Sequence, residues 1–208
     1  MHKYASTVNT DKFVYVTISI VAILTSYLLG ELSKYVGFRV PWWISIPTPL
    51  ALFGVIHWIF DGYAWRWRVG TTTLSGTPDL RGRWEGTFST DFTEPHVSPA
   101  TTNTDKTTIR VAIDQRWHSI SIRAETSHSW SESITATITT EAPIVVRYTY
   151  RNTPRNESVN TMTMHTGTCE LRYVDADTCE GDYYTDRNRR TTGSMNLKRV
   201  RSREEIGA

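Results

Sequence analysis

The chain has few of the residue patterns on which metal sites and catalytic centres depend. It contains only two cysteines, Cys169 and Cys179, with no CxxC pair and no neighbouring paired histidine, so a metal site is not expected. No GxSxG, HExxH or Walker loop is present. Asp175 and Asp177 lie in a turn-like segment and do not form an evident acid–base pair. We therefore predict a protein that is not an enzyme and holds no metal or cofactor.

An excess of charge is also missing. The chain has 23 Lys and Arg residues against 21 Asp and Glu residues, a formal net charge of +2. That balance argues against coating of a nucleic acid, and neither DNA nor RNA is an expected partner. Its 208 residues suffice for one ordinary domain and a small second one.

Two segments near the N-terminus lack charged residues altogether. Phe13–Leu29 and Trp42–Phe60 contain no Asp, Glu, Lys or Arg, and a membrane span needs ~20 apolar residues, with roughly 17 as the lower limit. No Ala-x-Ala-like cleavage site follows the first segment, which disfavours a signal peptide. The two segments predict a transmembrane hairpin within residues 1–69.

Basic residues flank this predicted hairpin on its outer ends. Lys3 and Lys12 precede the first segment, and Arg66 and Arg68 follow the second. The positive-inside rule therefore places both termini in the cytoplasm. A cytoplasmic C-terminal domain would keep its cysteines reduced.

The remainder of the chain shows the alternation of β-strands. Residues 70–79 form a polar linker, and from residue 80 aliphatic residues alternate with polar ones, as in Ile109, Val111 and Ile113. Eight such strands are expected over residues 80–200, followed by a tail at 201–208. Eight consecutive strands predict an all-β up-and-down barrel, whose interior is filled by side chains or holds one small ligand.

Two stretches of these strands offer polar side chains to a ligand. Tyr148, Tyr150 and Asn152 share one face of their strand, which is either the wall of a site or part of the core. Thr126, Ser129 and Ser131 lie in a polar run between strands, which is either a solvent-exposed loop or the mouth of the barrel.

An ordered set of sequence blocks gives the chain a family resemblance. The apolar hairpin is followed by PDLRGRWEGTF, IDQRWHSISIRAETSHSWSESITATI, VVRYTYRNTP, HTGTCELRY and GDYYTDRNRRTTGSMNLKR. In this arrangement the chain resembles the two-transmembrane, β-strand-rich effectors of bacterial anti-phage CBASS systems. The resemblance covers nearly the whole chain.

The resemblance implies a multi-pass protein of the bacterial inner membrane whose cytoplasmic barrel is calycin-like. Such a barrel binds a cyclic oligonucleotide, typically a cyclic dinucleotide made by a cognate nucleotidyltransferase. Binding promotes homo-oligomerisation, and the hairpins then disrupt the bilayer, so that the infected cell dies before phage mature. The cyclic dinucleotide is thus the activating ligand.

The last block carries the residue types that such a ligand needs. Arg187 and Arg190 offer planar forks for phosphate, and Tyr183 and Tyr184 offer faces for base stacking. We expect Arg187 and Tyr183 to contact the ligand first and Thr191 next. Strand alternation puts Arg187 and Thr191 on one face, unless a turn at 186–190 breaks the count. Alternatively, Arg187 forms a salt bridge with Asp186 or Asp182, and Tyr183 belongs to the core.

Trp84, in Gly82-Arg83-Trp84, resembles the tryptophan that plugs one end of lipocalin-like barrels. We interpret it as structural, with Lys198 or Arg199 packed across the ring. Two alternative functions stay open: a membrane-anchored, lipocalin-like barrel that binds a lipid or apolar ligand, and a ligand-free scaffold. A polar cavity favours the nucleotide, an aliphatic cavity favours the lipid, and a filled interior favours the scaffold.

Overall fold

The computed structural model of the chain describes residues 1–7, 11–35, 48–70, 72–90, 107–158, 163–187 and 191–200. It divides into two compact units. One unit is Val8–Thr77, and the other joins Met1–Thr7 to Pro78–Ala208. The expected ranges assigned residues 1–69 to the hairpin, whereas the structure groups the first seven residues with the β-rich unit.

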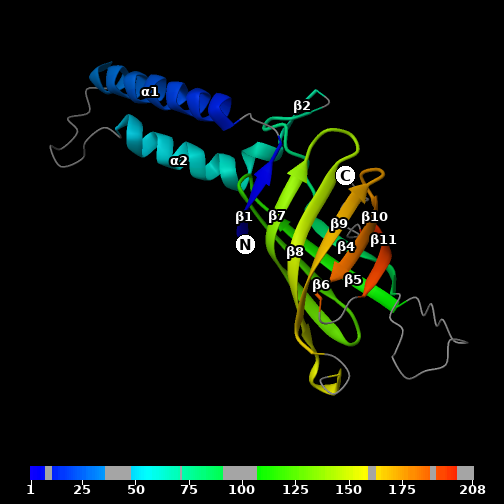
Figure 1. Cartoon of the computed structure of the whole chain (residues 1–208). Helices are drawn as coiled ribbons and strands as arrows, with labels where there is room; N and C mark the ends of the chain where they lie inside the picture. Colours follow the sequence, from blue (N-terminus) through cyan, green and yellow to red (C-terminus); the bar gives the residue numbers. More distant parts are fainter. Residues whose placement is uncertain are drawn as a thin grey trace, which may run out of the picture. The chain divides into compact units, whose positions relative to one another are not determined.

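Two apolar helices dominate the first unit (Figure 1). Helix α1 spans Asp11–Tyr35 and helix α2 spans Pro49–Gly62. They pack together, and the ring of Tyr15 stacks on that of His57 with centroids 5.6 Å apart. A short 3-10 helix, η1 (Ala64–Arg66), and the two-stranded ribbon of β2 (Arg68–Val69) and β3 (Thr72–Thr73) follow.

Among the described helices, α1 is the one long and apolar enough to cross a membrane. Its most apolar window has a mean hydropathy of 2.0. Helix α2 has 14 residues, and positions 42–47 of the second predicted span lie outside the described residues. The transmembrane hairpin therefore stays a prediction.

The second unit is a closed β-barrel (Figure 1). All eight strands predicted from alternation are present: β4 (Gly82–Thr90), β5 (Thr107–Gln115), β6 (Ser119–Glu125), β7 (Ser129–Thr139), β8 (Val145–Pro154), β9 (His165–Tyr173), β10 (Thr178–Thr185) and β11 (Thr192–Val200). A 3-10 turn, η2 (Asn156–Ser158), follows β8. Consecutive strands pair antiparallel, and β11 pairs back onto β4, with Met195 opposite Phe88.

A ninth strand corrects the predicted count of eight. Strand β1 (His2–Ser6) lies between β6 and β7, antiparallel to the first and parallel to the second. Strands β6 and β7 pair with each other only beside their connecting turn, from Arg123 opposite Glu132 to Glu125 opposite Trp130. Strand β1 has only five residues, near the N-terminus, and so short a segment shows too little alternation to be recognised as part of a sheet that lies far along the sequence.

One end of the barrel is closed by a packed aromatic cluster. Trp84 is fully buried, and Tyr173 meets it edge-on with centroids 5.4 Å apart. The guanidinium of Arg199 lies 4.7 Å from the centre of the indole, a cation–π contact. The structural interpretation of Trp84 is confirmed, with Arg199 as the basic residue that covers it.

Replacing Trp84 with alanine should destabilise the barrel severely. Loss of a fully buried indole costs ~3–5 kcal/mol of unfolding free energy. Trp130→Ala is the matched control, because Trp130 is 43% exposed, and it should change stability by less than ~0.5 kcal/mol. Denaturant unfolding of the full chain in detergent, followed by near-ultraviolet circular dichroism, measures both. Equal losses would show that Trp84 does not hold the closed end.

Candidate functional site

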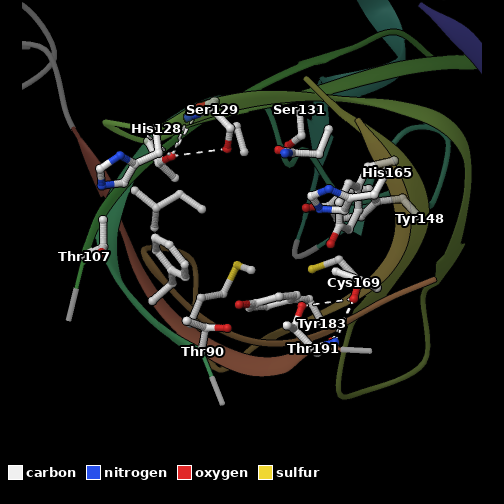
Figure 2. A pocket seen from close by; sticks show the side chains of 18 residues that line it. Thr90, Thr107, His128, Ser129, Ser131, Tyr148, His165, Cys169, Tyr183 and Thr191 are labelled. Carbon is white, nitrogen blue, oxygen red and sulfur yellow. Dashed lines mark hydrogen bonds between the residues drawn. The ribbon is translucent and has the colours of Figure 1, made fainter. Parts of the chain in front are cut away.

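A cavity of about 220 Å³ occupies the barrel at the end opposite Trp84. Its wall comes from strand ends at the β4–β5, β6–β7, β8–β9 and β10–β11 connections (Figure 2). The lining residues are Phe88, Thr90, Thr107, Ile109, Ala124, Thr126, His128, Ser129, Ser131, Tyr148, Tyr150, Asn152, His165, Cys169, Tyr183, Thr185, Thr191 and Met195.

Eight of the eleven predicted site residues line this cavity: Thr126, Ser129, Ser131, Tyr148, Tyr150, Asn152, Tyr183 and Thr191. Strand β8 supplies three of them, and the alternation of Tyr148, Tyr150 and Asn152 does place all three inward, with each side chain buried. The two tyrosines also belong to the core cluster, so the wall of the cavity and the core are continuous.

Two glycines keep the cavity open. A Cβ atom at Gly167 would lie 2.4 Å from the hydroxyl oxygen of Tyr150, and one at Gly193 would lie 2.6 Å from Cε1 of Tyr183. No real Cβ tolerates such contacts, so any larger residue would push the rings away from the wall. Glycine at these positions lets both rings lie close against the neighbouring strands.

The β6–β7 turn is built around one hydroxyl. Thr126 Oγ1 accepts hydrogen bonds from the backbone N–H groups of His128 and Ser129, at 3.2 and 3.1 Å. Threonine favours such turns because its side chain can replace a backbone partner. Thr126 therefore shapes the rim, while Ser129 and Ser131 project from β7 into the cavity (Figure 2).

The described start of the β10–β11 connection agrees with the turn alternative as far as Arg187, and residues 188–190 lie outside the described residues. Strand β10 ends at Thr185 and Arg187 lies exposed in the turn. The N–H of Thr191 donates to Thr185 Oγ1 at 2.8 Å, and Thr191 is 3% exposed. Asp186 ties the turn to β9, since its carboxylate accepts from the N–H of Thr166 at 3.1 Å.

The other candidates in this block lie away from the cavity wall. Tyr183 points inward, whereas its neighbour Tyr184 is 55% exposed. Arg187 is not among the lining residues, and Arg190 lies outside the described residues. Asp182, one of the two aspartates considered as partners of Arg187, forms an ion pair with Arg172.

His165 is a lining residue that the sequence analysis did not select. Its side chain is 8% exposed, and Nδ1 lies 2.9 Å from the carbonyl oxygen of Thr163. A carbonyl oxygen only accepts, so Nδ1 carries the hydrogen and Nε2 of the neutral ring is an acceptor. The sequence contained a pattern that could have identified this residue. His165, Gly167 and Cys169 alternate along HTGTCELRY, which places His165 on the same face of the strand as the cysteine.

The described wall of the cavity carries hydroxyls, rings, an amide and two imidazoles, but no Lys, Arg, Asp or Glu. Burial raises the pKa of the Cys169 thiol to about 12, although a hydrogen bond with Tyr148 opposes the shift. Burial likewise raises the pKa of Cys179 to about 12. Both cysteines are free thiols, and Cys169 is the one that lines the cavity. The described wall therefore carries no carboxylate, ammonium or guanidinium group and suits a polar aromatic group.

Both thiols should resist alkylation in the folded chain. With a pKa of about 12, only about one thiol in ten thousand is ionised at pH 8, and the thiolate is the reactive form. Iodoacetamide at pH 8 should leave both cysteines unmodified in the native protein and modify both in guanidinium chloride, as measured by peptide mass spectrometry. Rapid labelling of native Cys169 would show that this thiol is not a buried, protonated group of the cavity wall.

Comparison with known proteins matches the part of the chain that forms this barrel. CD-NTase-associated protein 15 of Yersinia aleksiciae is 30% identical over 126 residues, which are 59% of this chain and 56% of that protein. The chain thus spans little more than half the length of this relative. The family described as "Cap15, cyclic dinucleotide receptor domain" matches residues 75–199. That segment contains β4 to β10, β11 except its last residue, and every described residue of the cavity wall, and the chain belongs to this family.

Proposed function

We propose that the chain is a CBASS effector whose barrel senses a cyclic dinucleotide in the cavity. The observation that carries the proposal is one of position. The segment that matches the receptor family encloses an open cavity lined by tyrosine rings and hydroxyls. A receptor of this kind binds without chemistry, so the protein acts as a sensor rather than an enzyme.

The size of the cavity limits how much of the ligand it takes. Pockets that enclose a whole drug-sized ligand hold ~300–1,000 Å³, and this one holds about 220 Å³. We therefore place one nucleobase inside, stacked on Tyr183 or Tyr150, with Asn152 and Ser131 bonding its polar edge. Stacking on an aromatic ring contributes ~1–3 kcal/mol per base.

The phosphates then remain at the mouth of the barrel. The described wall offers them no Lys or Arg, whereas the sequence between β10 and β11 contains Arg187 and Arg190. Asp186 fixes the start of this connection against β9. In this arrangement the arginines act as rim groups for phosphate, which they bind through paired N–H donors. Tyr183 thus keeps its predicted role of stacking on a base inside the cavity, and Arg187 keeps its predicted role of binding phosphate at the rim.

Two features of the cavity count against the alternative functions. Hydroxyls of Thr90, Thr107, Ser131 and Thr185 interrupt the apolar wall, and a lipid chain offers no hydrogen bond to such groups. A ligand-free scaffold would be expected to fill this space, because protein interiors pack with few voids.

We propose further that the apolar helices anchor the barrel in the inner membrane as a hairpin. Helix α1 is long and apolar enough to span a bilayer. Strand β1 before α1 and strand β4 after α2 belong to the same barrel, which supports entry and exit of the chain on one side. Both termini are then cytoplasmic, and ligand-driven homo-oligomerisation of the hairpins disrupts the bilayer of the infected cell.

Tyr183→Ala should weaken cyclic dinucleotide binding by roughly 5- to 150-fold, since a stacked base is lost. Its neighbour gives a matched control: Tyr184→Ala removes the same ring from the outer surface and should change affinity less than about twofold. Isothermal titration of the full chain in detergent with cyclic di-AMP, cyclic di-GMP, cyclic GMP–AMP and cyclic UMP–AMP measures both. If the wild-type chain binds none of them, the proposed function is wrong.

Arg187→Ala tests the placement of the phosphates. Loss of a charged hydrogen-bond donor costs ~1.5–3 kcal/mol, so affinity should fall by about tenfold or more and depend less steeply on salt. Arg151→Ala is the control, because Arg151 is an exposed arginine of β8. Titrations at low and high potassium chloride distinguish the outcomes. Unchanged affinity and salt dependence would remove the phosphates from this rim.

A further inference from the structure

We propose that β1 is a displaceable strand that couples the cavity to helix α1. When a ligand occupies the cavity, β6 and β7 extend their direct pairing, and β1 leaves the barrel wall. This inference rests on the proposed function of the cavity. It adds the route by which occupancy of the barrel reaches the membrane helices.

Strand β1 is the most weakly held part of the described wall. It has five register pairs in all: His2 with Ile120 and Lys3 with Ser119 on β6, and three pairs with β7 that begin at Tyr4. The β8–β9 ladder, by contrast, runs over eight register pairs without a break, from Val145 to Asn152. Because strand stability grows with the number of paired residues and buried side chains, β1 is the strand that the barrel releases at least cost.

The seam that holds β1 continues directly into the cavity. Ala124 and Ser131 are opposite each other in the short β6–β7 ladder, and both line the cavity. Two residues further along β7, Ser133 Oγ accepts from the N–H of Ile122 at 2.9 Å. The same oxygen is hydrogen-bonded to Nε2 of His2 at 2.7 Å. Ser133 therefore joins β6, β7 and β1 at one point.

The backbone of β7 changes partner at this point. Its register with β8 shifts between Ser133 and Thr135, and beyond the shift β7 pairs with β1, Tyr4 lying opposite Ala136. Such a bulge re-aims a strand and ends one ladder. A base that hydrogen-bonds Ser131 would pull β7 toward β6, and the ladder would lengthen into the place that β1 occupies.

A short connection transmits the movement to α1. Strand β1 ends at Ser6 and α1 begins at Asp11. Five peptide steps extend at most ~18 Å, at ~3.6 Å each. If β1 moves away from the barrel by more than this connection can extend, α1 has to move with it. Release of β1 therefore changes the position or the freedom of α1.

The other connection to the helices stays anchored. The side chain of Gln115 donates to the carbonyl oxygen of Pro78 at 3.1 Å and accepts from the N–H of Leu80 at 2.9 Å. Tyr4 is held at the same end of the barrel, where its hydroxyl donates to the carbonyl oxygen of Trp117 at 2.5 Å. Both connections thus leave the closed end, opposite the mouth of the cavity, and only the one through β1 is displaceable.

Hydrogen exchange on the full chain in lipid nanodiscs tests the movement. The cyclic dinucleotide that binds the wild type in the titrations above is added to saturation. Amides of residues 2–6 should exchange at least tenfold faster, and those of Ile120, Ile122 and Ala136 should be no less protected than before. Exchange of residues 2–6 that is unchanged or slower would overturn the proposal.

A disulfide across the seam tests the coupling itself. Lys3 and Ser119 are opposite each other at the outer surface, and the native thiols are buried. The K3C/S119C variant should bind the ligand about 5- to 150-fold more weakly when oxidised than when reduced, the usual range of coupling between two sites. The matched control is R147C/E170C, which joins two opposed residues of β8 and β9 and should bind equally in both states.

The two failures are distinguishable in this experiment. If reduced K3C/S119C and the wild-type chain bind no cyclic dinucleotide, the proposed function fails and the coupling fails with it. If the reduced form binds and the oxidised form binds equally well, the sensor stands and β1 is a fixed strand of the wall.

Discussion

Closure of the sheet by pairing of β11 with β4 is the constraint on which the rest of the structure depends. A closed sheet has no free edge, and every strand then has one face fixed inward. The closure needs an unusually close approach, since a Cβ atom at Gly86 would lie 1.8 Å from the carbonyl oxygen of Asn196. With the faces fixed, the type of side chain at each inward position decides what each end of the barrel can do.

The inward-facing residues fill one end of the barrel and leave a cavity at the other. At one end Trp84, Tyr173 and Arg199 fill the interior and leave no room for a ligand. At the other end tyrosines and hydroxyls line an open cavity whose described wall has no Lys, Arg, Asp or Glu. In the proposed function this wall receives a base, and Arg187, just after β10, contacts a phosphate. The strands would then recognise the base, and the connection between β10 and β11 would recognise the charge.

The match to the receptor family covers residues 75–199 and therefore leaves out both β1 and the two helices. The parts of the chain that would convert binding into an effect on the membrane are thus the parts that lie outside the match. Strand β1 belongs to the barrel by its pairing and to the helical segment by its position in sequence. In the proposed coupling, β1 is the connection through which binding in the barrel reaches the helical unit.

The sequence by itself determined the eight strands of residues 80–200, the apolar first helix and the common face of Tyr148, Tyr150 and Asn152 on β8, because the alternation of a strand and the hydropathy of a helix are local properties of the chain. Only the tertiary structure decided that Tyr183 and not Tyr184 faces the cavity, because strand alternation fixes opposite faces but not which one is inside. A turn after Thr185 separated Arg187 from the wall, since a turn resets the count. Strand β1 was not predicted because its five residues show no clear strand pattern by themselves. They form a strand only by pairing with residues that are distant in the sequence, such as Ser119 and Ala136.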